Sequence, residues 1–64
     1  MTQTDVEHIH VPADADGQRL DRWLKKRMPF VLAQKLIRTG QIRVDGKRVK
    51  PDTRISEGQD VRIP

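Results

Sequence analysis

The stretch that most constrains the fold is residues 36–49, which read Leu-Ile-Arg-Thr-Gly-Gln-Ile-Arg-Val-Asp-Gly-Lys-Arg-Val. Gly40 stands where a helix commonly ends, because a residue without Cβ readily takes the left-handed conformation that closes the last turn. After it, Ile42 and Val44 alternate with polar residues, which is the period of a half-buried strand. Asp45-Gly46 is typical of a type I′ turn, which needs a positive φ at both central positions. The sequence therefore predicts a helix that runs directly into a β-hairpin.

A two-residue turn fixes which residues of the two hairpin strands face each other. The expected pairs are Val44 with Lys47, Arg43 with Arg48, and Ile42 with Val49. The apolar side chains then share one face of the hairpin, and Arg43 and Arg48 meet on the other. Like charges directly opposite each other destabilise a strand pair. We therefore expect an anionic group to compensate for the two arginines.

Positive charge is concentrated in the part of the chain that is expected to fold. Sixty-four residues allow one domain with a small core. Residues 1–16 contain four acidic residues and no Lys or Arg, a charge of −4, whereas residues 17–64 contain thirteen basic and five acidic residues, a charge of +8. This imbalance indicates a polyanionic partner, with nucleic acid as the first candidate and an anionic membrane surface as the second. The alternative is that these charges only keep the surface soluble.

Composition also excludes several classes of site. The chain has no Cys, so disulfides and thiolate metal sites are excluded. No apolar run approaches the ~18 residues that a membrane span needs. The acidic N-terminus lacks the apolar segment of a secretory signal. We expect a cytoplasmic protein that has no membrane partner, no cofactor and no small-molecule ligand.

The residues before the hairpin divide into a flexible end, a strand and two helices. Residues 1–7 are polar and expected to be flexible, which leaves residues 8–64 as the folded domain. Residues 8–11 alternate in the pattern of an edge strand with its apolar residues turned inward, and Pro12 can end it.

Two short helices are predicted next. The first covers residues 18–28, where apolar residues recur at helical spacing and Asp16 can cap the first turn. Pro29 ends this helix, and the second covers residues 32–39. The short connection makes the two helices an αα-hairpin.

The chain ends with a further strand. Pro51-Asp52 breaks the hairpin strand, residues 57–60 read as a turn, and residues 61–63 alternate as a strand. Together these elements predict an α+β fold, in which the αα-hairpin packs on a small, mostly antiparallel sheet.

Basic side chains on the two helices and the hairpin could form one continuous surface for phosphate groups, which Arg contacts through two parallel hydrogen bonds. The candidate RNA-binding residues are Arg19, Arg22, Lys26, Lys35, Arg38, Arg43, Lys47 and Arg48. Aromatic residues for base stacking are scarce: Trp23 falls on an apolar helix face and is expected in the core, and Phe30 lies between the helices. Recognition of structured RNA through shape and phosphates is therefore expected.

Two other groups of residues are candidates for a metal site or a catalytic site. His8 and His10 point to one side of the predicted strand, but no third metal ligand accompanies them. Arg19-Leu20-Asp21 could be a catalytic acid held by an arginine, but an acidic residue in the first turn of a helix also complements the helix dipole. No nucleophile–base pair or metal-ligand cluster is present. We expect no catalytic or metal site in this segment.

These residues resemble the RNA-binding domain named after small-subunit ribosomal protein four. The resemblance covers about residues 16–63, and its motifs are residues 19–21, 36–40, 42–49 and 58–61. The version seen here is most similar to the N-terminal domain of ribosomal large-subunit pseudouridine synthases.

In those enzymes the domain is tethered to a separate catalytic domain that isomerises uridine with an aspartate. The resemblance implies docking on structured RNA, with large-subunit ribosomal RNA as the expected partner, and a C-terminal catalytic domain in the parent chain. The synthase catalytic motif also contains Arg-Leu-Asp, but in the downstream domain, so Asp21 is not assigned the chemistry. The RNA contacts that the resemblance implies are Arg19, Arg22, Lys35, Arg38, Arg43 and Lys47; Lys26 and Arg48 rest on the spacing and register arguments.

One departure and several alternatives stay open. Many members begin the second helix with Lys-Ser or Ser-Arg, whereas this chain has Phe30-Val31, which puts the usual helix cap and one RNA contact in question. The domain could also belong to another parent, such as an RNA methyltransferase, a tRNA synthetase or a ribosome-associated protein. A DNA-binding helix-turn-helix and a protein-interaction module are further alternatives.

Overall fold

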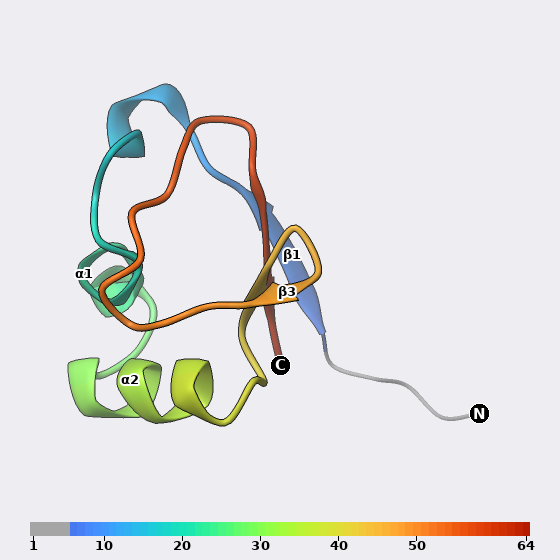
Figure 1. Ribbon diagram of the computed structural model, residues 1–64. Helices are drawn as coiled ribbons and strands as arrows, with labels where there is room; N and C mark the ends of the chain where they lie inside the picture. Colours follow the sequence, from blue (N-terminus) through green and yellow to red (C-terminus); the bar gives the residue numbers. More distant parts are fainter. Residues whose placement is uncertain (1–5) are drawn as a thin grey trace.

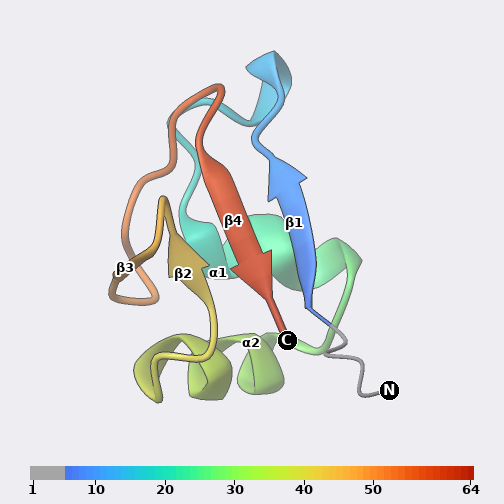
Figure 2. The same ribbon diagram turned by 90° about the vertical axis from the view of Figure 1, so that its right-hand side faces the viewer.

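The computed structural model describes residues 6–64, which form one antiparallel sheet with helices against one of its faces (Figures 1 and 2). The elements are β1 (Glu7–His10), the 3₁₀ helix η1 (Ala13–Ala15), α1 (Leu20–Trp23), the 3₁₀ helix η2 (Leu24–Lys26), α2 (Phe30–Arg38), β2 (Arg43–Val44), β3 (Lys47–Arg48) and β4 (Asp60–Ile63). Figure 2 shows α1 behind the sheet and α2 below it. The predicted α+β class is confirmed.

The sheet places the last strand of the chain at its centre. Its order is β1-β4-β2-β3, and every neighbouring pair is antiparallel. Val61 of β4 lies opposite Ile9 of β1 on one side and Val44 of β2 on the other. The predicted edge strand is confirmed as β1, which begins at Glu7, one residue earlier than expected. The predicted flexible segment was residues 1–7, of which Glu7 belongs to β1 and residues 1–5 lie outside the described residues.

The hairpin has the predicted turn and register. Asp45 and Gly46 have φ values of 52° and 78°, as a type I′ turn requires. Arg43 pairs with Arg48, and Val44 pairs with Lys47. Ile42 and Val44 are buried, and Val49 packs against the core.

A Schellman motif ends α2 and leads into the hairpin. The Gly40 N–H donates to the Ile37 carbonyl at 3.1 Å, and the Gln41 N–H donates to the Leu36 carbonyl at 2.9 Å. Gly40 has a φ of 81°, as predicted for the residue that closes this helix. A Cβ atom on Gly40 would lie 2.8 Å from Nε of Arg48, so the helix end and strand β3 approach closely here.

The first helix differs from its prediction at both ends. The α-helix covers only residues 20–23 and continues as the 3₁₀ helix η2, instead of running over residues 18–28. The later start is caused by long-range backbone pairing, because the Gly17 N–H donates to the Ile55 carbonyl at 2.7 Å and the Ile55 N–H donates to the Gln18 carbonyl at 2.9 Å. Residues held in this extended pairing are not available to a helix.

The predicted cap of the first helix is also wrong. Asp16 accepts a hydrogen bond at 2.8 Å from the Glu57 backbone N–H, so it holds the loop before β4 instead of capping α1. Arg19 occupies the N-cap position of α1 and makes no side-chain cap bond. The second helix begins at Phe30, two residues earlier than predicted, because Pro29 already serves as its N-cap residue.

The core lies between the sheet and the two helices and includes Trp23, as predicted. Its buried apolar residues are Val11, Ala15, Leu20, Trp23, Leu24, Ala33, Ile37, Ile42, Val44, Ile55, Val61 and Ile63. The first turn of α2 is different, since Phe30, Val31 and Leu32 are 36%, 75% and 41% exposed. Over residues 6–64, the helices are too short and too polar to cross a membrane.

Gly40→Ala tests the helix–hairpin junction. The substitution places a Cβ on a residue that has the left-handed backbone conformation, which costs about 1–2 kcal/mol of stability. The new Cβ also displaces Arg48 from its hydrogen bond to the end of α2, which costs about 1 kcal/mol more. Urea unfolding should show a larger loss of stability for Gly40→Ala than for Gly46→Ala, where the positive φ is similar but the space is open.

A double-mutant cycle isolates the contact with Arg48. In an Arg48→Ala background, Gly40→Ala should destabilise the protein no more than Gly46→Ala does. An unchanged effect in that background would contradict the close approach.

Candidate RNA-binding surface

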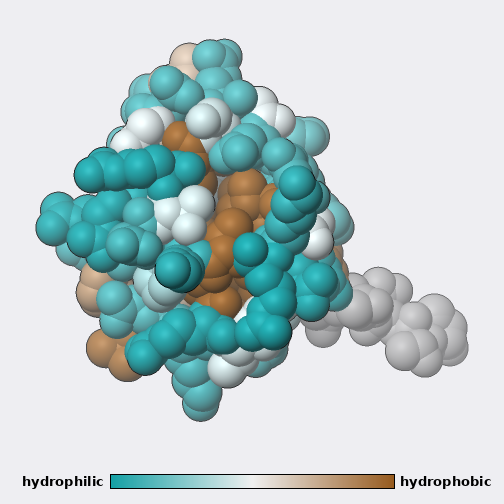
Figure 3. All heavy atoms as spheres, in the orientation of Figure 1, coloured by the Kyte–Doolittle hydropathy of each residue, from teal (hydrophilic) through white to brown (hydrophobic). Residues whose placement is uncertain are grey.

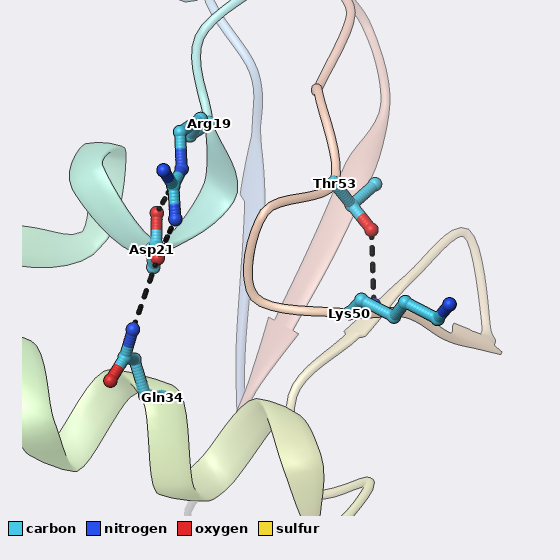
Figure 4. Close-up of polar contacts among 5 residues, drawn as sticks. All are labelled: Arg19, Asp21, Gln34, Lys50 and Thr53. Carbon is cyan, nitrogen blue, oxygen red and sulfur yellow. Dashed lines mark hydrogen bonds and ion pairs between the residues drawn. The ribbon is translucent and has the colours of Figure 1, made fainter.

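A buried ion pair at the start of α1 fixes the position of Arg19 (Figure 4). Arg19 donates from Nε to Oδ1 of Asp21 at 3.2 Å and from Nη2 to Oδ2 at 2.8 Å. Gln34 of α2 donates to the same Oδ2 atom at 3.4 Å. The Asp21 side chain is fully buried, whereas the Arg19 side chain is 35% exposed. Asp21 thus joins α1 to α2 and holds a guanidinium at the surface.

The charge state of Asp21 follows from these contacts. Burial alone would raise the pKa of Asp21, but the hydrogen bonds from Arg19 and Gln34 and the charge of Arg19 outweigh it, so the pKa lies below its ordinary value of 3.8. The carboxylate is therefore ionised at neutral pH, buried and hydrogen-bonded through both of its oxygens. This environment suits a structural anion.

Arg19 borders two surface hollows that contain most of the helical arginines. The first hollow is lined by Gln18, Arg19, Arg22 and Arg54. The second hollow is lined by Arg19, Gln34, Arg38, Pro51 and Asp52. We call these two hollows with their lining residues the Arg19 surface. The structure thus brings together three of the candidate residues, Arg19, Arg22 and Arg38.

Arg54 belongs to this surface although sequence reasoning missed it. The loop after β3 lies beside α1 (Figure 1), and Arg19 and Arg54 form an isolated antiparallel bridge. Arg54 donates from Nη1 to the Gly17 carbonyl at 3.0 Å. Its only signal in the sequence was its positive charge, because the residues around it follow no helical or strand period.

The hairpin arginines bind the end of α2. Arg43 donates from Nε to the Gly40 carbonyl at 3.0 Å, and Arg48 donates from Nη2 to the Arg38 carbonyl at 3.1 Å. The carbonyl end of a helix carries partial negative charge. The anionic compensation expected for the opposed arginines is therefore supplied by backbone carbonyls within the protein. Arg62 of β4 lies beside Arg43 in the same cross-strand row.

The three candidate lysines lie outside the two hollows. Lys26 lines a different hollow beside β1, together with residues such as His10 and Arg27. Lys35 on α2 and Lys47 on β3 are exposed. On the face seen in Figure 3, hydrophilic residues surround a narrow apolar strip.

The two histidines lie on the edge strand, and His8 has an acidic partner. Nδ1 of His8 lies 2.8 Å from Oδ2 of Asp60. Residues 6–64 contain no group of three His, Cys, Asp or Glu side chains that could hold a metal ion.

The chain belongs to the S4 domain family, which is a family of RNA-binding domains. The family model matches residues 18–61, which is more than half of the chain. The match includes the Arg19 surface, the helix–hairpin junction and the first residues of β4. The family resemblance inferred from the sequence motifs is thereby confirmed.

Several curated relatives are named "Ribosomal large subunit pseudouridine synthase C". The protein from Buchnera aphidicola subsp. Schizaphis graminum (strain Sg) is 39% identical over 64 residues, covering 95% of this chain and 20% of the relative. The protein from Escherichia coli (strain K12) is 37% identical over 62 residues, covering 92% of this chain and 19% of the relative. The chain therefore spans about a fifth of the length of the relatives it matches.

Asp21→Asn tests the buried ion pair. The amide keeps the shape of the side chain but removes its charge, so we expect a loss of about 1.5–3 kcal/mol in the free energy of unfolding at pH 6. Asp52→Asn is the matched control, because Asp52 is an exposed aspartate at the same surface, and its effect should stay within about 0.5 kcal/mol.

The pH dependence gives a second readout of the same pair. Because the pKa of Asp21 is lowered in the folded state, its contribution is complete above the unfolded value of 3.8 and is lost as the pH falls through the lower folded value. Urea unfolding between about pH 6 and pH 2 should show a smaller acid-induced loss of stability in Asp21→Asn than in the unchanged protein. Identical pH profiles of the two proteins would contradict the lowered pKa of Asp21 in the folded state.

Proposed function

We propose that this chain docks structured ribosomal RNA through the Arg19 surface, and that it does so for a pseudouridine synthase catalytic domain of the same parent protein. The observation that carries the proposal is the buried Asp21 carboxylate, which fixes one arginine between two others in a domain of an RNA-binding family. The proposed contacts on this surface are Arg19, Arg22 and Arg38. Lys35 on α2 and Lys47 on the hairpin, which are exposed but lie outside the two hollows, are proposed as further contacts.

The geometry favours phosphate recognition. A guanidinium has five N–H donors, and the bonds from Arg19 to Asp21 use two of them. The remaining donors stand in a fixed orientation at the surface, so binding a phosphate requires little further ordering of this side chain. Arg22 and Arg38 flank it and add positive charge that the ion pair does not neutralise.

Scarce aromatic side chains favour folded RNA over single strands. The chain has one Trp, one Phe and no Tyr. Trp23 is buried in the core, which leaves Phe30 as the exposed aromatic residue. Proteins that bind single strands generally stack bases on aromatic side chains. A surface of fixed arginines fits the phosphates of a folded RNA better.

The proposed parent follows from the relatives. They are named as synthases of the ribosomal large subunit, and the chain covers about a fifth of each. In the proposed parent protein, this domain docks the RNA, and a separate catalytic domain supplies the isomerase activity. Arg43 and Arg48 act chiefly within the protein in this account, because they bind the end of α2. Lys26 is left out of the surface because it lies beside β1.

The exposed first turn of α2 favours one second candidate, a protein-interaction module. Phe30, Val31 and Leu32 present adjacent apolar side chains to solvent. A protein partner held there would bind by apolar burial and depend weakly on salt, whereas RNA binding depends steeply on salt.

Replacing Lys35 and Arg38 together by Gln tests the proposed surface. Each lost phosphate contact should lower the slope of log affinity against log salt by about one, so the double variant should bind a ribosomal RNA stem-loop more weakly and with a slope lower by about two. Circular dichroism should show an unchanged fold, since both side chains are exposed.

The matched control removes two positive charges elsewhere. Arg27 lines the hollow beside β1. Arg62 points away from the core face of β4, on which Val61 and Ile63 are buried. Replacing Arg27 and Arg62 by Gln should change the affinity much less. Equal losses in the two double variants would show that binding follows net charge alone and would overturn the site.

A further inference from the structure

We infer that the hollow lined by Gln18, Arg19, Arg22 and Arg54 binds one phosphodiester group of the RNA backbone, with Arg54 as a phosphate ligand. The inference rests on the proposed function, because it names the RNA phosphate as the anion. It adds to that function a defined site and a residue from the loop after β3, a part of the chain that no motif had connected with RNA.

The residues that line this hollow are all polar or positively charged, and none of them is acidic. The lining consists of three arginines and one glutamine. The neighbouring hollow differs, because Asp52 lines it beside Arg19 and Arg38. A carboxylate repels a phosphate, so the first hollow is the better anion site of the two. The glutamine amide adds a neutral donor.

Arg19 forms the fixed wall of the site. Its guanidinium is held by two bonds to the buried Asp21 carboxylate, and Asp21 is itself held by Gln34. The Arg19–Asp21 pair is close to neutral as a unit. Arg19 therefore supplies mainly oriented N–H donors, and the net positive charge of the site comes from Arg22 and Arg54.

Arg54 is held on both sides by backbone pairing. The Leu20 N–H donates to the Thr53 carbonyl at 2.8 Å, and Ile55 exchanges hydrogen bonds with Gly17 and Gln18. One N–H group of the Arg54 side chain donates to the Gly17 carbonyl. The other four of its five N–H groups remain for a ligand. A residue fixed in this way loses little conformational entropy on binding.

The chemistry of the site fits a phosphodiester. Arginine forks bind the paired non-bridging oxygens of a phosphate through parallel hydrogen bonds. Arg19 and Arg54 approach from two chain segments that bridge each other, and Arg22 approaches from α1. One phosphate group between them can accept bonds from all three side chains.

Arg54→Gln in the 64-residue chain is the direct test, with Arg27→Gln, in the hollow beside β1, as the matched control. For a ribosomal RNA stem-loop, Arg54→Gln should weaken binding about tenfold at low salt and lower the slope of log affinity against log salt by about one. Arg27→Gln should change both quantities much less. Arg54→Lys should recover the salt slope but only part of the affinity, because Lys keeps the charge and lacks the fork.

The Nε–H signals of the arginines in ¹⁵N NMR spectra give an independent readout. On titration with the same RNA, the signals of Arg19, Arg22 and Arg54 should shift together, and that of Arg27 should stay in place. Circular dichroism should confirm that Arg54→Gln and Arg54→Lys are folded.

Different results would overturn the Arg54 phosphate site and the proposed RNA-docking function. Steep, RNA-selective binding by the unchanged chain, with equal effects of Arg54→Gln and Arg27→Gln, would overturn this phosphate site and leave the proposed function standing. Failure of the unchanged chain to bind the RNA would overturn both.

Discussion

The burial of one charged carboxylate, that of Asp21, sets the requirements that the rest of the structure meets. An ionised carboxylate inside a protein is strongly unfavourable unless donors surround it. Here those donors come from Arg19 at the start of α1 and from Gln34 on α2. The two helices are thereby tied to each other at a polar point as well as through the apolar core. The same contact leaves an arginine oriented at the surface, so the ion pair that stabilises the fold also fixes the central arginine of the proposed RNA-binding surface.

The hairpin arginines solve a similar problem with backbone carbonyls. Arg43 and Arg48 face each other across β2 and β3, which would destabilise an isolated hairpin. Arg48 donates to the Arg38 carbonyl in the last turn of α2, where the helix dipole is negative, and Arg43 donates to the carbonyl of Gly40, which follows the C-cap of that helix. Gly40 permits this arrangement, because a side chain there would occupy the place of the Arg48 guanidinium. These two positive charges thus have a structural role, because they join the helix to the hairpin.

The predictable features of this fold are those decided by residues close in sequence. The Asp45-Gly46 turn, its register and the glycine that ends α2 follow from local rules of backbone geometry, and the motifs that carry the family resemblance lie in the same segments. The start of α1 and the role of Asp16 were missed, because residues 16–20 pair with residues 53–57, far along the chain. Arg54 was missed for the same reason. Its place beside Arg19 exists only once this pairing has formed.

The most direct test of the central claim, that the Arg19 surface recognises structured RNA, is a comparison of two ligands. The affinity of the chain for a ribosomal RNA stem-loop and for a DNA duplex of equal charge would be measured over a salt series. The account predicts tighter binding of the RNA, with a salt slope that corresponds to about three or more phosphate contacts. Equal affinity for RNA and DNA would reduce the surface to a general polyanion site, and affinity independent of salt would contradict the account.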